Sequence, residues 1–353
     1  MPTLAAAEAS NAAFAPNYLP VAVFVGGTSG VGQAMAEGFA RQMKGHAHII
    51  IIGRNATAAA EILAAFPKPS KSDGWAHEFV PCDASSMADV RAVCEGLSAR
   101  LVYINFLVIT AGGPAANSLV ASSVTPEGLD DHLAMRYFMR YIFTKELLPL
   151  LVRARENGQH AHMMTVLGAG FGISIPTTDL GLHEARRRSI KILQGVTPSI
   201  AAVKGMIRGV AYNDGLVAHF ASLHPEIAFT HIMPGQVLTV GGSKMGGLGW
   251  LLAPLTWLLN LFKASISITQ DESAQYMLYG LLDGDRGLFI RGQRGDVISA
   301  HVFNPDHKAH FDVTAHKTRT QGVLRGVPMK GYGGSDASVA GLIAYTESVL
   351  AAI

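Results

Sequence analysis

The chain has 353 residues, of which 49% are hydrophobic and only 15% are charged, so it can bury one large core and an appendage. Its formal net charge is +2, and its basic residues are spread along the chain apart from the run at 186–188. This dispersed charge argues against a nucleic-acid partner. Cys82 and Cys94 are too few for a disulfide framework and lack a metal-ligand spacing with histidine. We therefore expect no metal and a reducing, cytoplasmic setting.

The first residues, 1–18, have neither the basic start of a secretory signal nor the arginines of a transit peptide, and we expect a frayed arm there. No run reaches the roughly 18 apolar residues of a membrane-spanning helix. We place the main domain at residues 19–303 and an extension at residues 304–353.

Residues 21–35, VAVFVGGTSGVGQAM, join an apolar run to a glycine-rich turn and a helical pattern. The turn contains Gly26, Gly27, Gly30 and Gly32. Glycines permit a tight turn, a close approach of the backbone to a pyrophosphate and close packing of a helix on a strand. The N-terminus of the following helix would receive the phosphate charge. The unit predicts a dinucleotide site.

Strands and helices alternate along the rest of the main domain. Further strands are expected at residues 49–52, 78–81, 104–109, 162–166, 227–232 and 288–290. Helices are expected at about residues 58–66, 84–100, 126–153, 199–223 and 273–282. Because parallel neighbours need crossover connections, this alternation predicts an α/β, Rossmann-type, doubly wound parallel sheet. An apolar lid and the C-terminal extension would complete it.

The end of the second strand bears on which dinucleotide binds. An acidic residue there would accept hydrogen bonds from the ribose hydroxyls of NAD, but Gly53 occupies that place and Arg54 follows it. An arginine can pair with a 2′-phosphate through its planar fork. We therefore expect NADP(H) as the cofactor, and the alternative is an arginine that is merely exposed at a strand end.

Motifs at the strand ends resemble those of the short-chain dehydrogenase/reductase superfamily over about residues 21–299. GGTSGVG stands where that family has its TGxxxGxG turn, and Asp83 stands where it contacts adenine. Thr110, Ala111 and Gly112 stand where it has NNAG. The resemblance implies a bound nicotinamide dinucleotide.

A fourth motif follows the sixth strand. Pro234, Gly235, Val237 and Thr239 match the family's PGxVxT stretch, whose threonine meets the nicotinamide carboxamide. The full set of expected cofactor-binding residues is Gly26, Thr28, Ser29, Gly30, Val31, Gly32, Arg54, Asn55, Asp83, Ala111, Gly112, Lys204, Pro234, Gly235, Val237 and Thr239.

The family's catalytic Asn, Ser, Tyr and Lys have no counterparts at the expected spacings. Counting from neighbouring strands puts these positions at Arg136, Leu167 or Gly168, Lys204 and Arg208. Lys204 could transfer a proton if burial beside Arg208 disfavours its ammonium form. Arg136 could clamp a carbonyl oxygen or a carboxylate. The alternative for Arg136 is an arginine paired with a carboxylate on a helix surface. The alternative for Lys204 and Arg208 is an exposed helix face.

Two further polar features of the sequence bear on catalysis. Asp179 lies in an irregular segment that is longer than the family's usual serine-to-tyrosine interval, and it could act as a base or simply cap a turn. A YxxxK pattern at Tyr141 and Lys145 precedes the fifth strand, so we interpret it as a chance match.

The segment at about residues 241–264 stands where the family folds over its substrate, and its apolar part runs from Leu248 to Phe262. Such a lid predicts a lipophilic small-molecule substrate, with peripheral membrane contact or burial against the body as alternatives. The tail carries an amphipathic helix around residues 339–350, which we expect to pack on the body or on another subunit of a homodimer.

The leading hypothesis is an NADP(H)-dependent oxidoreductase that acts on a lipophilic carbonyl or alcohol with an atypical catalytic site. A second hypothesis is a non-redox isomerase, lyase or cyclase on the same scaffold, using Arg136, Lys204, Arg208 or Asp179 for acid–base work. A third is an NADP-binding protein without catalysis. A change in nicotinamide absorbance on turnover separates the first hypothesis from the other two.

Overall fold

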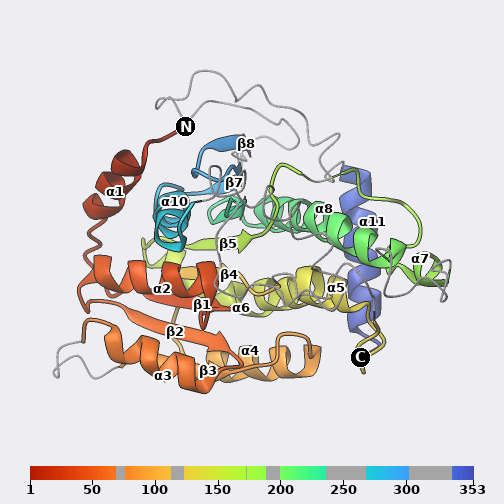
Figure 1. Ribbon diagram of the computed structural model, residues 1–353, viewed down its shortest axis with the longest axis horizontal. Coiled ribbons are helices and arrows are strands. Elements are labelled where there is room, and N and C mark those ends of the chain that lie inside the picture. Colours follow the sequence, from red (N-terminus) through yellow and green to blue (C-terminus); the bar gives the residue numbers. More distant parts are fainter. Residues whose placement is uncertain (69–75, 113–122, 172, 188–198, 236–267, 302–335) are drawn as a thin grey trace, which may run out of the picture.

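The computed structural model describes residues 1–68, 76–112, 123–171, 173–187, 199–235, 268–301 and 336–353. Its centre is an eight-stranded sheet in the order β3-β2-β1-β4-β5-β6-β7-β8, with helices on both faces (Figure 1). The strands are β1 (Val21–Val25), β2 (His48–Gly53), β3 (Glu78–Pro81), β4 (Phe106–Ile109), β5 (His162–Val166), β6 (Ala228–Ile232), β7 (Gly287–Arg291) and β8 (Val297–His301).

All neighbouring strands pair in parallel except β7 and β8, which pair antiparallel. The chain winds outward from β1 to β3 and then returns to add β4 on the other side of β1. The predicted doubly wound α/β fold is confirmed. In such sheets, ligands bind beyond the carboxyl ends of the strands where the strand order reverses, which is between β1 and β4 here.

Each face of the sheet carries its own core because strand side chains alternate between faces. Val21, Val23 and Val25 of β1 join one core, whereas Ala22 and Phe24 join the other. The helices of the first core include α4 (Met87–Arg100), α5 (Asp131–Leu133), the π-helix η1 (Ala134–Phe138), α6 (Met139–Glu156), α8 (Ile200–Leu223) and α11 (Asp336–Leu350). Those of the second are α1 (Leu4–Ala13), α2 (Gly30–Met43), α3 (Ala56–Ala65) and α10 (Gln270–Leu282).

Helix boundaries follow local capping chemistry. The helix predicted at 199–223 begins at Ile200, and the Ser199 hydroxyl caps it by accepting from the Ala202 amide at 3.5 Å. The helix predicted from residue 126 begins only at Asp131, because Gly128 turns the chain at φ +84° and Asp130 caps the helix. The edge strand β8 was not predicted.

The expected frayed arm at residues 1–18 is wrong, because α1 is an ordered helix that packs on α10. Ala7 is fully buried, and the Asn11 side-chain amide donates to the Gln275 carbonyl at 3.0 Å and to its side-chain oxygen at 2.9 Å. The Thr3 hydroxyl caps the helix by accepting from the Ala6 amide. Tertiary packing thus orders a segment whose sequence alone does not favour a long helix.

The predicted C-terminal helix is α11, and it packs on α8 of the same chain. Leu342 is fully buried there, and the Tyr137 and Thr346 hydroxyls are 2.8 Å apart. Tyr141 and Lys145, the chance YxxxK pattern, both bond to the Glu347 carboxylate of α11. That pattern therefore holds the extension to the body.

Two expectations fall outside the described residues. The apolar lid at 241–264, including Leu248 to Phe262, is one, and the stretch of the tail at 304–335 is the other. Among the helices that the structure does describe, none has the length and hydropathy to cross a lipid bilayer.

Candidate functional site

The glycine-rich turn lies where the end of β4 presses against the end of β1. Gly26 has φ +89°, and a Cβ placed on it would lie 2.6 Å from the Ala111 nitrogen. A Cβ on Gly32 would lie 2.3 Å from the Thr110 hydroxyl oxygen, which itself donates to the Val25 carbonyl at 3.0 Å. Only glycine fits at these two positions without displacing backbone. The turn is thus packed closely against the end of β4 at the carboxyl edge of the sheet.

The N-terminus of α2 follows this turn directly. Gly30 has φ +59°, and within the described residues the Ser29 side chain makes no capping hydrogen bond. Amide groups in the first turn of this 14-residue helix therefore lack the usual side-chain acceptor. An N-terminus of this kind binds an anion such as a pyrophosphate. The predicted phosphate cradle of residues 26–32 is consistent with this geometry.

An open pocket of about 610 Å³ lies beside the turn and is lined by Thr28, Ser29, Arg54, Asn55, Ala56 and Thr57. Arg54 is exposed on it, and the Asn55 side-chain oxygen caps α3 by accepting from the Ala58 amide at 3.0 Å. The pocket therefore combines the cationic side chain of Arg54 with the N-terminus of α3, two features that attract a phosphate group.

Asp83 follows β3, the neighbour of β2 in the sheet, and its carboxylate accepts hydrogen bonds from the Ser85 amide and hydroxyl at 3.0 and 2.7 Å. Partial burial raises the pKa of the Asp83 carboxyl, but these hydrogen bonds and the charge of Arg54 outweigh it and hold that pKa below its usual value. Asp83 is therefore ionised near neutral pH and is fixed in orientation.

The remaining cofactor positions follow β4 and β6. Gly112 has φ +111° and lies over Arg140, whose guanidinium would be 3.3 Å from a Cβ there. Gly235 has φ +78°, and the Pro234 carbonyl accepts from the Ser273 hydroxyl at 2.8 Å. Val237 and Thr239 lie outside the described residues.

Lys204 and Arg208 lie on α8, one turn apart, but in different environments. Lys204 is exposed, so it lacks the burial that the predicted role in proton transfer requires. Arg208 is buried rather than lying on an exposed helix face, and it donates to the Asp179 carbonyl. Its guanidinium is also 3.8 Å from the Asp179 carboxylate.

Asp179 binds backbone amides of the short helix α7 (His183–Arg187). Its φ is +53°, and its carboxylate accepts from the Glu184 amide at 2.9 Å and the Ala185 amide at 3.2 Å. These contacts favour the capping alternative over a role as a base. The Arg208–Asp179 pair fixes the turn before α7 against α8, and Tyr212 adds a hydrogen bond to the Leu180 carbonyl at 3.0 Å.

Arg136 lies on the π-helix η1, and its side chain packs across Gly209 of α8. Only 7% of its surface is exposed. Its backbone carbonyl accepts from the side-chain amide of Asn213 at 2.6 Å, which fixes η1 against α8. Leu167 and Gly168 follow β5 and are half-buried.

A buried polar network that the sequence did not predict lies behind these residues. Arg140 is fully buried and donates to the carbonyls of Ile109, Ala111 and Val166, at the carboxyl ends of β4 and β5, at 3.3, 2.5 and 3.1 Å. It also donates to the Thr165 hydroxyl, which in turn donates to the Asn213 side-chain oxygen at 2.7 Å. Charged residues also occur elsewhere along α6, so no local pattern marks Arg140 as buried.

Burial and the nearby charge of Arg136 lower the pKa of Arg140 to about 9. Arg140 is therefore still protonated at neutral pH. The floor of the site beneath Gly112 carries a fixed positive charge.

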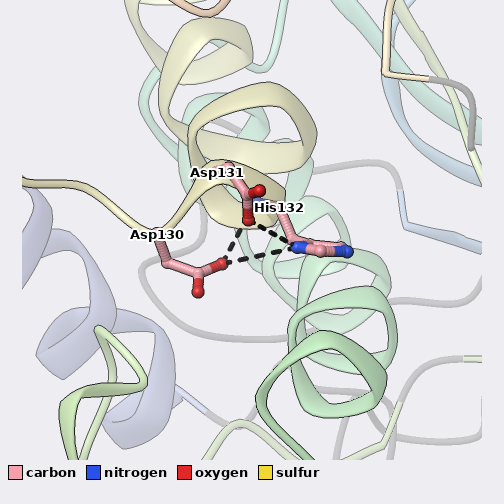
Figure 2. A group of neighbouring side chains, drawn as sticks. All are labelled: Asp130, Asp131 and His132. Carbon is pink, nitrogen blue, oxygen red and sulfur yellow. Dashed lines mark hydrogen bonds and ion pairs between the residues drawn. The ribbon is translucent and has the colours of Figure 1, made fainter. Parts of the chain in front are cut away.

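Figure 2 shows a separate group at the start of α5, where Asp130, Asp131 and His132 lie together. Asp130 caps the helix by accepting from the amides of His132 and Leu133 at 3.1 and 3.2 Å. Asp131 accepts from the Ser123 hydroxyl at 2.6 Å and bonds to the His132 ring at 2.7 Å. Helix capping accounts for this proximity, and we assign the group no ligand.

The comparisons with known proteins agree with this geometry. A family model described as short chain dehydrogenase matches residues 20–171. An oxidoreductase named andH from Emericella variicolor is 33% identical over 259 residues, which cover 73% of this chain and 68% of that relative. The chain belongs to the short-chain dehydrogenase/reductase superfamily. It is thus an oxidoreductase of the short-chain type, a class that uses a nicotinamide cofactor.

Two other curated proteins and one solved structure also match. Oxidoreductase AN1596 from Emericella nidulans is 33% identical over 239 residues, covering 68% of this chain and 65% of that protein. Human polyprenol dehydrogenase is 28% identical over 156 residues, 44% of either chain. Among solved structures, an NADPH-bound carbonyl reductase from chicken fatty liver has a TM-score of 0.53 at 15% identity and covers 82% of this chain and 97% of its own. That last likeness concerns the fold alone.

Proposed function

We propose that this short-chain dehydrogenase/reductase is specific for NADP(H) and acts on a lipophilic carbonyl or the corresponding alcohol. The observation that carries the cofactor preference is Arg54, exposed on a pocket that also contains the N-terminus of α3. A 2′-phosphate in that pocket would meet both the guanidinium and the helix amides. Gly53 supplies no carboxylate to receive ribose hydroxyls, which favours NADP(H) over NAD(H).

Residues of this chain would hold the dinucleotide along the carboxyl edge of the sheet. Gly26 and Gly32 let the turn lie close against the end of β4, the N-terminus of α2 would offer amides to the pyrophosphate, and Asp83 would orient the adenine. When bound, the nicotinamide supplies or accepts the hydride. Arg136 is buried and occupies the position that counting assigns to the family's asparagine, and we assign it a role in binding substrate oxygen rather than in proton transfer.

Two observations support a lipophilic substrate. The segment Leu248 to Phe262 is almost wholly apolar, as expected for a wall that contacts a hydrocarbon chain. In addition, one relative is named polyprenol dehydrogenase, and a polyprenol is a lipophilic alcohol. Decanal should therefore be reduced with a higher kcat/KM than propanal.

The cofactor test is a fluorescence titration of the protein with NADPH and with NADH. NADPH should bind about 10- to 100-fold more tightly, since charge-assisted hydrogen bonds contribute about 1.5–3 kcal/mol. Arg54→Ala should weaken NADPH binding by that factor and leave NADH binding unchanged. Arg41→Ala is the matched control, because Arg41 is an exposed arginine that pairs only with Glu37 and Asp271 among the described residues.

Equal binding of NADH and NADPH by the unaltered protein would contradict the cofactor proposal. Reduction itself is followed by loss of the NADPH absorbance with decanal. Product formation without that loss would instead support a non-redox reaction on this scaffold.

A further inference from the structure

Two buried arginines, Arg136 and Arg140, lie one helical turn apart where η1 meets α6. They lie close enough that the charge of Arg136 lowers the pKa of Arg140. Arg140 is completely buried and Arg136 is 7% exposed. A positive charge of two units is therefore concentrated in a small volume on one face of the sheet.

The contacts of Arg140 do not neutralise this charge. Its partners are three backbone carbonyls and the Thr165 hydroxyl, all of which are uncharged. Among the residues that the structure describes, no carboxylate forms an ion pair with either arginine. Arg140 thus has hydrogen bonds at Nη1 and Nη2, whereas its buried Nε has none among the described residues and no counter-charge meets the guanidinium there.

The Arg136 guanidinium has no hydrogen-bond acceptor within the described parts of the chain. Burial is the sole cause that lowers the pKa of Arg136. Its backbone is nevertheless fixed, because Asn213 donates to its carbonyl and its side-chain carbons pack on Gly209. A buried cation held in place without a partner is costly unless an anion meets it.

The position of Arg136 and Arg140 in the fold indicates which anion would meet their charge. Arg140 binds the carbonyls that end β4 and β5, and its guanidinium lies under Gly112. Those strand ends border the crevice where the strand order reverses, which is where ligands bind in open α/β sheets. The phosphate cradle at Gly26 to Gly32 occupies the β1 side of that crevice, whereas Arg136 approaches from the α8 side.

We propose that Arg136 binds a carboxylate of the substrate, so that the substrate is a lipophilic oxo acid or hydroxy acid. Arg140 is a positioning residue that anchors the strand ends and adds its charge to the same field. This assignment rests on the proposed function, since it names the substrate class of that site. A carboxylate matches the planar fork of a guanidinium and would supply the missing counter-charge.

The test is a calorimetric titration of the NADP⁺-saturated protein with octanoate and with 1-octanol, which share a chain length and differ in charge. Octanoate should bind about tenfold or more tightly than octanol, as charge-assisted hydrogen bonds require. Arg136→Met keeps the length and apolar packing of the side chain, and it should abolish that preference. Arg136→Lys should restore part of it, because the charge returns without the fork.

Controls separate this effect from misfolding and from cofactor binding. Arg41→Met should keep the full preference, and Arg136→Met should keep both the melting temperature and the NADP⁺ affinity. Equal binding of octanoate and octanol by the unaltered protein would overturn the proposal. So would a loss of NADP⁺ affinity in Arg136→Met with the octanoate preference intact, because the arginine would then serve a cofactor phosphate.

Failure of the proposed function would look different. If the unaltered protein binds neither NADPH nor NADH, the oxidoreductase proposal fails. An octanoate preference that depends on Arg136 in the cofactor-free protein would still support the carboxylate site.

Discussion

At the scale of single residues, the space around Gly32 sets the strictest requirement in the cofactor site. A Cβ at this position would lie 2.3 Å from the Thr110 hydroxyl oxygen and 2.4 Å from the Gly26 carbonyl oxygen. Gly32→Ala should therefore displace the turn, lower the free energy of unfolding by about 1–3 kcal/mol and reduce NADPH binding. Urea unfolding and a fluorescence titration measure the two effects.

The matched control is Gly96→Ala on α4, where an added Cβ would meet no atom within 4 Å. Both glycines lie within helices, but Gly96 is exposed and has no neighbour to displace. This change should stabilise the protein by about 0.5–1 kcal/mol, because alanine loses less backbone entropy in a helix. Equal losses in the two variants would refute the steric explanation for Gly32.

The sequence predicted where a residue lies when a strand end fixes its position. Arg54 directly follows β2, so its place beside Thr28 and Ser29 of the glycine-rich turn follows from the βαβ pattern, while its role in binding a phosphate stays a prediction. Counting along a helix gave the positions of Lys204 and Arg208 but not their burial. That difference depends on which elements cover α8, and the contact between Arg208 and Asp179 spans an irregular segment that has no periodicity.

At the scale of elements, a buried hydroxyl pair joins α11 to η1. Tyr137 and Thr346 are both fully buried. The Thr346 hydroxyl donates to the Leu342 carbonyl at 2.8 Å, and the Tyr137 hydroxyl lies 2.8 Å from it. Thr346→Val keeps the side-chain shape but leaves the Tyr137 hydroxyl without its partner. It should lower the free energy of unfolding by about 1–3 kcal/mol, as measured by urea unfolding.

The double variant Tyr137→Phe with Thr346→Val tests the pairing itself. Removing both hydroxyls should be less harmful than the sum of the two single changes, because no buried group is then left unsatisfied. Strict additivity would mean that the two hydroxyls are not coupled. Lys145→Ala serves as a surface comparison and should change stability by less than about 1 kcal/mol, since its ion pair with Glu347 is half-exposed.

Elements were predictable where the sequence has both a periodic pattern and a capping residue. The helix α8 has both, and its bounds agree with the prediction to within a residue. The helix α1 is short and alanine-rich, and its order comes from packing on α10, which no local pattern encodes. The π-turn of η1 inserts a residue that shifts the helical register, so it was also missed.

At the scale of the whole molecule, His162 couples the stability of the sheet to pH. It lies in β5, its Nε2 is 2.7 Å from the Thr230 hydroxyl of β6, and it is 1% exposed. Burial, followed by the charge of Arg291, lowers the pKa of His162 from 6.5 to about 3. The folded protein therefore keeps this ring neutral under conditions in which the unfolded chain protonates it.

Because the folded pKa is the lower one, stability is greatest above the unfolded pKa and falls as the pH drops below it. His162 alone should reduce the free energy of unfolding by about 2 kcal/mol between about pH 7 and pH 5. Urea unfolding at both pH values should show this loss in the unaltered protein and a smaller one in His162→Gln, whose amide can still bond to Thr230. His46→Gln, at an exposed position, should keep the full loss.

The two cores show why the fold class was accessible from the sequence and the substrate site was not. Continuous apolar runs such as Ile49 to Ile52 mark strands buried on both faces, and this property is local. The pairing of Arg136 with Arg140, by contrast, depends on η1, β4, β5 and α8 meeting in space. Arg140 could not be distinguished from a solvated arginine before those elements were placed.

The placement of α11 also affects how the protein would meet a second copy of itself. This helix lies against α8, and its Glu347 reaches α6, so the apolar surface between them is already covered within one chain. The residues that α11 turns outward include Ala340, Ala344 and Ser348, all exposed and all small. Tight protein–protein contacts rely on large anchors such as Trp, Tyr and Arg. The outward side of α11 therefore offers few anchor residues for a subunit interface, and we expect a homodimer to form through a different side of the molecule.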